Sequence, residues 1–237
     1  MKRFYREVAV EEVTGGWRVT LDGRAVKTAQ GAPQVVPARA LADALAAEWA
    51  GQGEEIDPAA FALRDLADYA IDMVRSDRTT AIDRLLAFAE TDTLCYRADP
   101  DEPLYRRQYE IWEPLVTATE AREGIALNRV SGVIHRAQPP QSLARLRERL
   151  ESLDDFTLAA LQTMASLTAS LCVALEALEA NAAPEALWSA ANLEEEWQAE
   201  LWGRDPEAEV RMEQRGLEFM CALEFARLTR LRQRRPQ

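Results

Sequence analysis

Histidine and cysteine are scarce in this chain, whose 237 residues include one histidine and three cysteines. The cysteines, Cys95, Cys172 and Cys221, lie far apart among apolar residues, which predicts buried free thiols in a reducing compartment. The sequence has no Glu-x-x-His pair of the kind that binds metal in helical bundles, so we expect no metal site. The single histidine, His135, has no serine or cysteine in a recognisable catalytic sequence to activate, so we expect no catalytic residue.

Positive charge is also in deficit, with 28 lysines and arginines against 40 aspartates and glutamates, which gives a net charge of -12. Binding to nucleic acid or to an anionic membrane needs a basic face that this chain cannot easily assemble. An acidic surface suits solubility or a basic patch on a protein partner. No glycine-rich loop precedes a helix, so we expect no phosphate site and no cofactor.

A long hydrophobic run is missing as well. The first residues lack an apolar signal core, so we expect no export signal and either a cytoplasmic protein or a mature form. The segment from Phe156 to Leu175 has no charged residue, but hydroxyl and amide side chains are spread through it. This composition predicts a central helix buried on most sides in a bundle, and no membrane insertion.

Residues 4–36 have the pattern of β-strands. Apolar side chains alternate with polar ones around Val8 and Val10, and again from Trp17 to Leu21. Gly15-Gly16 and Asp22-Gly23 are tight-turn signals, and the second is typical of a two-residue hairpin loop. A short strand is expected at 34–36. The pattern predicts a small antiparallel meander that needs a helix to cover one face.

From residue 38 the apolar residues recur at helical spacing. A stripe of Leu41, Leu45 and Trp49 predicts a helix over 38–50 with Trp49 in the core, and Asp57-Pro58 opens the next helix. Because the composition changes here, we place a domain boundary after residue 57, with an α+β domain over 1–57 and a helical domain over 58–237. Further stripes are Leu63, Leu66, Ala70 and Val74; Ile82, Leu85, Leu86 and Ala89; and Tyr105, Tyr109, Trp112 and Val116.

The later helices are expected at 141–152, 154–179, 184–202 and 206–231. Pro114 lies inside the helix that precedes them and predicts a kink. Between Gly124 and Pro140 the pattern is loose, and a strand or an extended loop is equally consistent with it.

The stretch from Leu193 to Asp205 concentrates four glutamates and two tryptophans at the end of a helix. Leu193, Trp197 and Leu201 continue an apolar stripe that starts at Ala190, and Gly203 ends the helix. Trp202 would point away from this stripe. Its ring either folds back over the turn at Gly203 or is presented to a partner, and the sequence does not decide between the two.

Three interpretations of these glutamates are open. Glu194, Glu195, Glu196 and Glu200 could supply the acid and base of glycoside chemistry, but that requires carboxylates facing each other across a cleft, whereas these share one helix. They could form a solvated face beside a packing stripe. They could also form the rim of a protein contact, because partly buried glutamate beside tryptophan is typical of a partner-binding surface.

Eight stretches, in order and at matching spacing through almost the whole chain, resemble the family of assembly chaperones that handle the α subunit of F-type ATP synthase. They are Arg3-Phe4-Tyr5; Leu21-Asp22-Gly23-Arg24 with Val26-Lys27-Thr28; Ala47-Glu48-Trp49 followed by Gln52; Ala70-Ile71-Asp72; Asp92 to Ala98; Gln108 with Trp112-Glu113-Pro114-Leu115; Ala137-Gln138-Pro139-Pro140; and the glutamate-rich stretch that ends in Trp-Gly-Arg-Asp.

The resemblance implies a small N-terminal α+β domain, an orthogonal helical bundle and no enzymatic activity. It also implies an ATP-independent chaperone that binds the free α subunit and shields its β-facing interface until the catalytic head is assembled. With this resemblance we expect a location in the bacterial cytoplasm, or in the mitochondrial matrix if the protein is organellar. We expect the free protein to be monomeric. The segment 127–136 departs from the family because it lacks the apolar strand expected there. By resemblance, the partner-binding residues are Trp49, Glu194, Glu196, Trp197, Glu200 and Trp202.

Such a chaperone is physically reasonable for this chain. An unassembled subunit exposes an apolar interface that is prone to aggregate, and a holder must cover it reversibly. Moderate affinity and solubility are then required, rather than a catalytic pocket. An adaptor for another protein partner is the main alternative, and a hydrolase that uses the carboxylates between Glu194 and Glu200 is the other.

Overall fold

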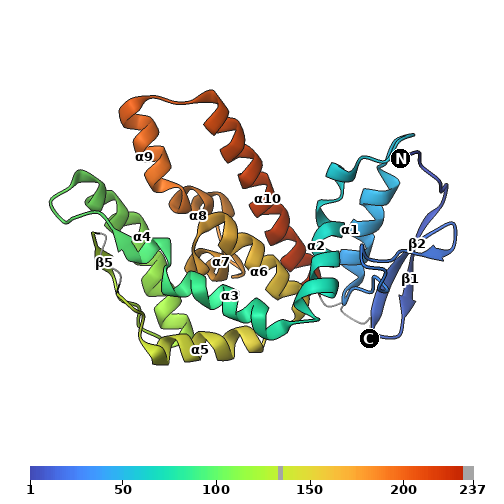
Figure 1. The fold of residues 1–237 in the computed structure, drawn as a ribbon, viewed down its shortest axis with the longest axis horizontal. Helices are drawn as coiled ribbons and strands as arrows, with labels where there is room; N and C mark the ends of the chain where they lie inside the picture. The colour runs from blue at the N-terminus through green and yellow to red at the C-terminus, as the bar shows by residue number, and fades with distance from the viewer. Residues whose placement is uncertain (133–135, 232–237) are drawn as a thin grey trace. The chain divides into compact units, whose positions relative to one another are not determined.

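The computed structural model describes residues 1–132 and 136–231 and shows an α+β fold, in which a small antiparallel sheet is followed by helices (Figure 1). The fold class predicted from the sequence is therefore confirmed. His135 lies outside the described residues, so the expectation for it stays a prediction.

The chain forms two compact units. The sheet unit comprises residues 1–78, 154–160 and the described residues from Cys221 onward, and the bundle unit comprises residues 79–153 and 161–220. The helices α6, Asp155–Thr168, and α10, Pro206–Arg230, contribute residues to both units. The boundary predicted after residue 57 stays a prediction.

Three antiparallel strands form the sheet in the order β1-β2-β3. They are β1 Val8–Val13, β2 Gly16–Leu21 and β3 Arg24–Ala25. Val8 pairs with Leu21 and Val10 with Val19, so the predicted alternation places these apolar side chains on one face. The hairpin loop is Asp22-Gly23 as predicted, with positive φ angles of 49° and 74°.

The strand expected at 34–36 is wrong, because this segment forms only an isolated antiparallel bridge between Trp17 and Val36. Pro33 and Pro37 bracket the segment and cannot donate backbone hydrogen bonds, which prevents a longer ladder. The bridge itself depends on Gly16, since a Cβ at that position would lie 2.2 Å from the carbonyl oxygen of Val36.

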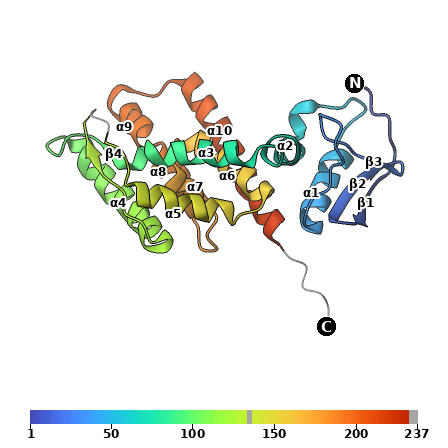
Figure 2. The same ribbon diagram turned by 60° about the horizontal axis from the view of Figure 1, so that its bottom comes forward.

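Helix α1, Arg39–Ala50, packs along β1 and β2 (Figure 2). Its predicted stripe of Leu41, Leu45 and Trp49 is buried. The Trp49 ring lies 5.6 Å from Tyr5 and 4.5 Å from Phe61, measured between ring centroids, and the Tyr5 hydroxyl donates to the Trp49 carbonyl at 2.6 Å. Trp49 is 8% exposed, so its ring belongs to the core of the sheet unit.

The next helix begins with a short 3-10 turn at Pro58–Ala60 and continues as α2, Ala62–Tyr69, and a π-helical turn at Ala70–Val74. The Glu48 carboxylate accepts hydrogen bonds from the backbone N–H groups of Leu63 and Arg64 at 2.7 and 2.9 Å, so a side chain of α1 caps the start of α2. Burial raises the pKa of Glu48, although these two bonds act in the opposite direction.

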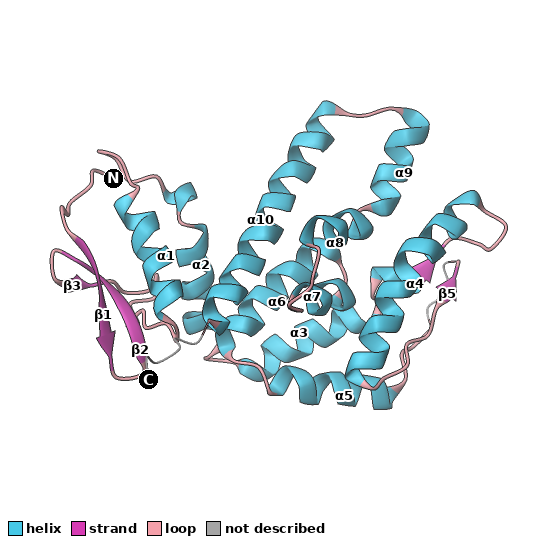
Figure 3. Cartoon of the chain, turned by 180° about the vertical axis from the view of Figure 1, so that it is seen from behind, coloured by secondary structure: helices cyan, strands magenta, loops and turns pink. Residues whose placement is uncertain are grey.

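The bundle unit is built from helices and one pair of very short strands (Figure 3). β4, Tyr96–Arg97, pairs in parallel with β5, Val130–Ser131, in the segment that the sequence left open between strand and loop. The helical elements not yet given are α3 Arg78–Glu90, a 3-10 turn at Thr93–Cys95, α4 Pro103–Glu123, α5 Pro140–Glu151, α7 Leu171–Ala177, α8 Pro184–Ala191 and α9 Leu193–Trp202.

Helix α4 departs from its predicted apolar stripe. Trp112 and Val116 are buried, but Tyr109 is 51% exposed, and Gln108 and Thr119 occupy the remaining buried positions. The helix continues through Pro114. Gln108 therefore takes the buried place that the pattern predicted for Tyr109, and Thr119 extends the buried face by one turn beyond the predicted stripe.

The single helix predicted over 154–179 is wrong, because the chain breaks between α6 and α7. Ala169 has a positive φ of 48°, and the Ser170 hydroxyl accepts from the N–H of Val173 at 3.0 Å, which caps α7. Most of the uncharged segment is buried within the protein, as predicted. No helix among the described residues is both long and apolar enough to cross a membrane.

The break is held by Asp92, which is completely buried. Its carboxylate accepts from the Ser170 hydroxyl at 2.7 Å, from the N–H of Cys172 at 2.9 Å and from the N–H of Leu94 at 3.1 Å. Burial raises the pKa of Asp92, and it raises the pKa of the neighbouring Cys95 thiol to about 12. Asp92 thus joins the turn after α3 to the start of α7.

All three cysteines are free thiols. Cys95 and Cys172 are buried as predicted, whereas Cys221 is only half-buried. Cys221 lies on α10, on a turn whose neighbours Ala222 and Leu223 face the core instead.

We predict that Asp92→Ala lowers the free energy of unfolding by about 3–5 kcal/mol, because it leaves three buried donors without an acceptor. Asp154→Ala is the matched control, since Asp154 accepts from the N–H groups of Phe156 and Thr157 and from the Thr157 hydroxyl but is exposed. Loss of this exposed cap should cost about 1 kcal/mol. Urea unfolding of both variants measures the difference, and equal losses would contradict the role given to burial.

Candidate partner-binding surface

The predicted helix over 184–202 is two helices, α8 and α9, which are separated by Asn192. Asn192 is buried, has φ and ψ angles of -102° and 19°, and donates from its side-chain amide to the carbonyl of Trp188 at 2.8 Å. The sequence carries no glycine or proline at this position to announce the break. Helix α9 therefore starts in a new direction, with Glu194, Glu195 and Glu196 in its first turn.

Helix α4 anchors the start of α9 by two buried side chains one helical turn apart. The indole N–H of Trp112 donates to the carbonyl of Ala190 at 2.7 Å, and the Gln108 amide donates to the Glu194 carboxylate at 2.6 Å. The Gln108 amide oxygen also accepts from the N–H of Ala98 at 2.8 Å. Because both ends of the Gln108 amide are engaged, Glu194 is held in one place.

Glu194 is half-buried as a result. Burial is the main cause that raises the pKa of Glu194, and the negative charge of Glu195 adds to it, while the hydrogen bond from Gln108 opposes both. Glu194 therefore connects α4 to α9, and most of its surface is turned away from solvent.

Glu200 and Trp197 form a second contact with α4, through Arg107. The guanidinium of Arg107 binds both oxygens of the Glu200 carboxylate, at 2.6 and 2.9 Å, and lies 5.5 Å from the centre of the Trp197 ring. The hydrogen bond from Arg107 lowers the pKa of Glu200. Glu196 lies nearer to α8, where the Ser189 hydroxyl donates to its carboxylate at 3.1 Å.

The far end of α9 is solvent-exposed. Every residue from Leu201 to Arg211 is exposed, with Leu201 at 56% and Trp202 at 80%. Trp202 is therefore presented outward and does not fold back over Gly203. The predicted apolar stripe is buried at Ala190 and Leu193 but wrong at Leu201, because no element of the described chain covers that end of the helix.

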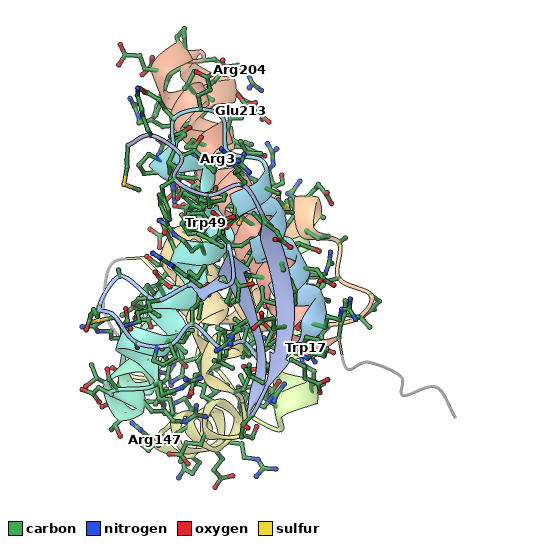
Figure 4. The ribbon with its side chains drawn as sticks, turned by 90° about the vertical axis from the view of Figure 1, so that its right-hand side faces the viewer. Arg3, Trp17, Trp49, Arg147, Arg204 and Glu213 are labelled. Carbon is green, nitrogen blue, oxygen red and sulfur yellow. The ribbon has the colours of Figure 1, made fainter. Side chains whose placement is uncertain are left out.

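Helix α10 returns from this exposed end (Figures 1 and 3). Asp205 caps its start by accepting from the N–H of Glu207 at 3.1 Å, and Arg204 pairs with Glu209 at 2.8 Å (Figure 4). Two more large apolar side chains, Val210 and Leu217, are 65% and 61% exposed on α10. We call Leu201, Trp202, Val210 and Leu217 the hairpin surface.

The base of α10 is fixed against α8. The rings of Trp188 and Phe219 lie 5.6 Å apart, and Phe219 is completely buried. Gly216 permits this approach, since a Cβ there would lie 3.2 Å from the indole nitrogen of Trp188. The hairpin thus has a packed base and an exposed end.

The structure brings together five of the six predicted partner-binding residues on α9: Glu194, Glu196, Trp197, Glu200 and Trp202. The sixth, Trp49, belongs to the sheet unit and is buried there. None of the six is shown to touch a partner, so their assignment stays a prediction. The sequence analysis missed Arg107 and assigned no role to Gln108; the spacing of Gln108 and Trp112, four residues apart, was the available signal.

The arrangement of the carboxylates disfavours acid and base chemistry at this site. Glycoside hydrolysis needs two carboxyl groups that face each other across a substrate. Here Glu194 is bonded to Gln108, Glu196 to Ser189 and Glu200 to Arg107, and all three project from one helix. The geometry is that of a supported surface with apolar residues at its end.

Comparison with known proteins gives a consistent result. The sequence model of the family described as ATP12 chaperone protein matches residues 2–120. The mitochondrial protein atp12 of Schizosaccharomyces pombe is 27% identical over 214 residues, which cover 85% of this chain and 74% of the yeast protein.

Solved structures agree over nearly the whole chain. The crystal structure of Atp12 from Paracoccus denitrificans matches with a TM-score of 0.92 and 36% identity, and the match covers 97% of this chain and 98% of that one. The Atu1473 protein of Agrobacterium tumefaciens matches with a TM-score of 0.91 and 38% identity, covering 95% and 85% of the two chains. The chain therefore belongs to the ATP12 chaperone family, the family whose motifs its sequence resembles.

Proposed function

We propose that this protein is a non-enzymatic assembly chaperone that binds the free α subunit of ATP synthase and shields its β-facing interface until assembly. The observation that supports this most directly is the hairpin surface, where four large apolar side chains are exposed on α9 and α10. In a protein with a net charge of -12, exposed apolar residues on one hairpin are typical of a contact site.

The glutamates of α9 give this apolar surface a negatively charged rim. Glu200 is bonded to Arg107, which also lies over the Trp197 ring, so its carboxylate is held in place and loses little entropy on binding. Carboxylates at the rim of an apolar contact favour a partner with basic residues around its own apolar patch. Family membership supports a protein client, and the identity of that client as the α subunit is the proposed step.

We predict that the protein co-elutes with the α subunit of its own ATP synthase in size-exclusion chromatography after co-expression, and that added β subunit displaces it. Displacement is expected because β competes for the same interface of α. If α remains soluble and elutes alone, the proposal fails, and a pull-down without a chosen partner would then test the adaptor alternative.

We predict that the double charge reversal Glu196→Lys with Glu200→Lys weakens binding to α by about tenfold, because it removes two rim carboxylates and repels basic partner residues. Thermal unfolding should change little, since an exposed ion pair such as Arg107–Glu200 contributes at most about 1 kcal/mol. The control is the pair Glu90→Lys with Glu224→Lys, which changes the net charge by the same amount at two exposed positions outside α9. Equal weakening by both pairs would mean that net charge, and not this site, determines affinity.

We predict opposite effects for the two tryptophans. Trp202→Ala should lower the free energy of unfolding by less than about 0.5 kcal/mol because its ring is exposed, yet weaken binding by about 2 kcal/mol if it is an interface anchor. Trp49→Ala should lower the free energy of unfolding by about 3–5 kcal/mol because it leaves a cavity in the core of the sheet unit. Urea unfolding and titration with α measure both quantities. A large stability loss for Trp202→Ala would remove it from the proposed surface.

A further inference from the structure

The sheet unit contains a groove of about 520 Å3 that shares no residue with the hairpin surface. Its apolar floor comes from Leu21 and Val26 of the sheet region and from the Trp49 ring, all of which are buried. Phe4, which is 64% exposed, forms one wall and packs edge-on against Tyr5 at a centroid distance of 5.3 Å. An exposed aromatic ring beside a buried apolar floor is the composition of a site that receives another side chain.

Trp49 gives the groove an unused hydrogen-bond donor. Its indole nitrogen is buried, and no acceptor among the described residues receives its hydrogen. An indole can only donate, and leaving a buried donor without an acceptor costs free energy. The neighbouring Tyr5 hydroxyl donates to the Trp49 backbone carbonyl and forms no hydrogen bond with the indole nitrogen.

The rim of the groove is positively charged. Arg24 and Lys27 line it, both are exposed, and neither forms an ion pair with another described residue. The only carboxylate in the lining, Asp22, accepts from the N–H groups of Arg6 and Glu7 at 3.0 and 2.8 Å. These two bonds lower the pKa of Asp22, and the nearby charge of Arg24 lowers it further. In a chain with a net charge of -12, a described lining with two cations and one carboxylate is locally positive.

We propose that this groove binds an extended acidic segment of the client protein. An apolar side chain of the segment packs against Phe4 and the floor, its carboxylates face Arg24 and Lys27, and one of its oxygens accepts the Trp49 indole hydrogen. Because that nitrogen is buried in the unbound protein, the lining opens slightly for this bond to form. The choice of client rests on the proposed function, whereas the chemistry of the segment rests on the groove alone.

The composition of the groove favours a protein segment over a small molecule. Small-molecule sites orient their ligands with several buried polar groups that converge, and here the Trp49 indole is the one buried polar side-chain group without a partner in the described lining. Aromatic anchors surrounded by exposed cations are instead typical of protein contacts, where the charges steer the partner and the aromatic rings hold it.

The test compares two double charge reversals by titration with purified α subunit. Arg24→Glu with Lys27→Glu reverses the rim, and Arg84→Glu with Arg145→Glu makes the same change in net charge on exposed positions of α3 and α5. We expect the rim pair to weaken binding by about tenfold and the control pair to leave it within about twofold. Thermal unfolding confirms that all variants remain folded.

The outcomes separate this inference from the proposed function. If α binds the wild-type protein and both double variants equally, the groove is not used and the inference fails, while the chaperone function stands. If α does not bind the wild-type protein at all, the proposed function fails, and the groove is tested without α.

That second test follows the indole N–H signals by NMR, with Trp49→Phe identifying the Trp49 signal while keeping an aromatic ring in the core. The probe is a synthetic peptide that alternates aspartate with leucine and phenylalanine, and the control peptide has lysine in place of aspartate. We expect the acidic peptide to shift the Trp49 signal and the basic peptide to leave it unchanged. No shift at millimolar acidic peptide, or equal shifts with both peptides, would overturn the inference.

Discussion

The hydrogen bonds that Gln108 and Trp112 donate from α4 to the junction of α8 and α9 determine where the candidate surface can form. The two side chains lie one turn apart on the buried face of α4, so a single rigid helix fixes both the Ala190 carbonyl and the Glu194 carboxylate. Without these bonds, the end of α8 would have an unpaired carbonyl and a buried carboxylate, both of which are costly. Helix α9 is therefore supported at its start, and its far end needs no packing partner of its own.

This support explains how exposed apolar residues can coexist with a stable fold. Trp202 and Leu201 contribute little to the core, so the stability of the bundle unit rests on residues such as Trp112, Phe219 and the Asp92 network. The residues that stabilise the fold are therefore different from those that are available for contact. The exposed apolar residues can bind a partner although the stability of the fold does not depend on them. The surplus of acidic residues opposes self-association of such a surface through repulsion between copies.

The sequence predicts elements well where local patterning decides them. Alternating residues and the Asp22-Gly23 turn predict the hairpin, and the stripes of α1 and α3 are buried as expected. It fails where a distant side chain decides the local structure. The break at Ala169 is held by Asp92, which lies in the turn after α3, and neither glycine nor proline marks it.

The candidate site shows the same division. Helical spacing places the glutamates and tryptophans on α9, but it cannot tell that Leu201 is uncovered or that Arg107 binds Glu200, because both facts depend on how α4 packs against α9. Gln108 was overlooked for a related reason: a polar residue in a buried position is recognisable only when its partners, the Ala98 N–H and Glu194, are known.

A holder that must release its client is better served by two modest contacts than by one strong contact. When two sites on one chain bind the same client, the first contact raises the effective concentration for the second, so moderate affinities add up to stable holding. A competing subunit can then displace one contact at a time, and each step costs only a fraction of the total binding free energy.

The hairpin surface and the sheet-unit groove have opposite charge at their rims, carboxylates at one and Arg24 and Lys27 at the other. Under the two proposals, the client presents basic residues to one rim and acidic residues to the other, and this combined requirement is more specific than either contact alone.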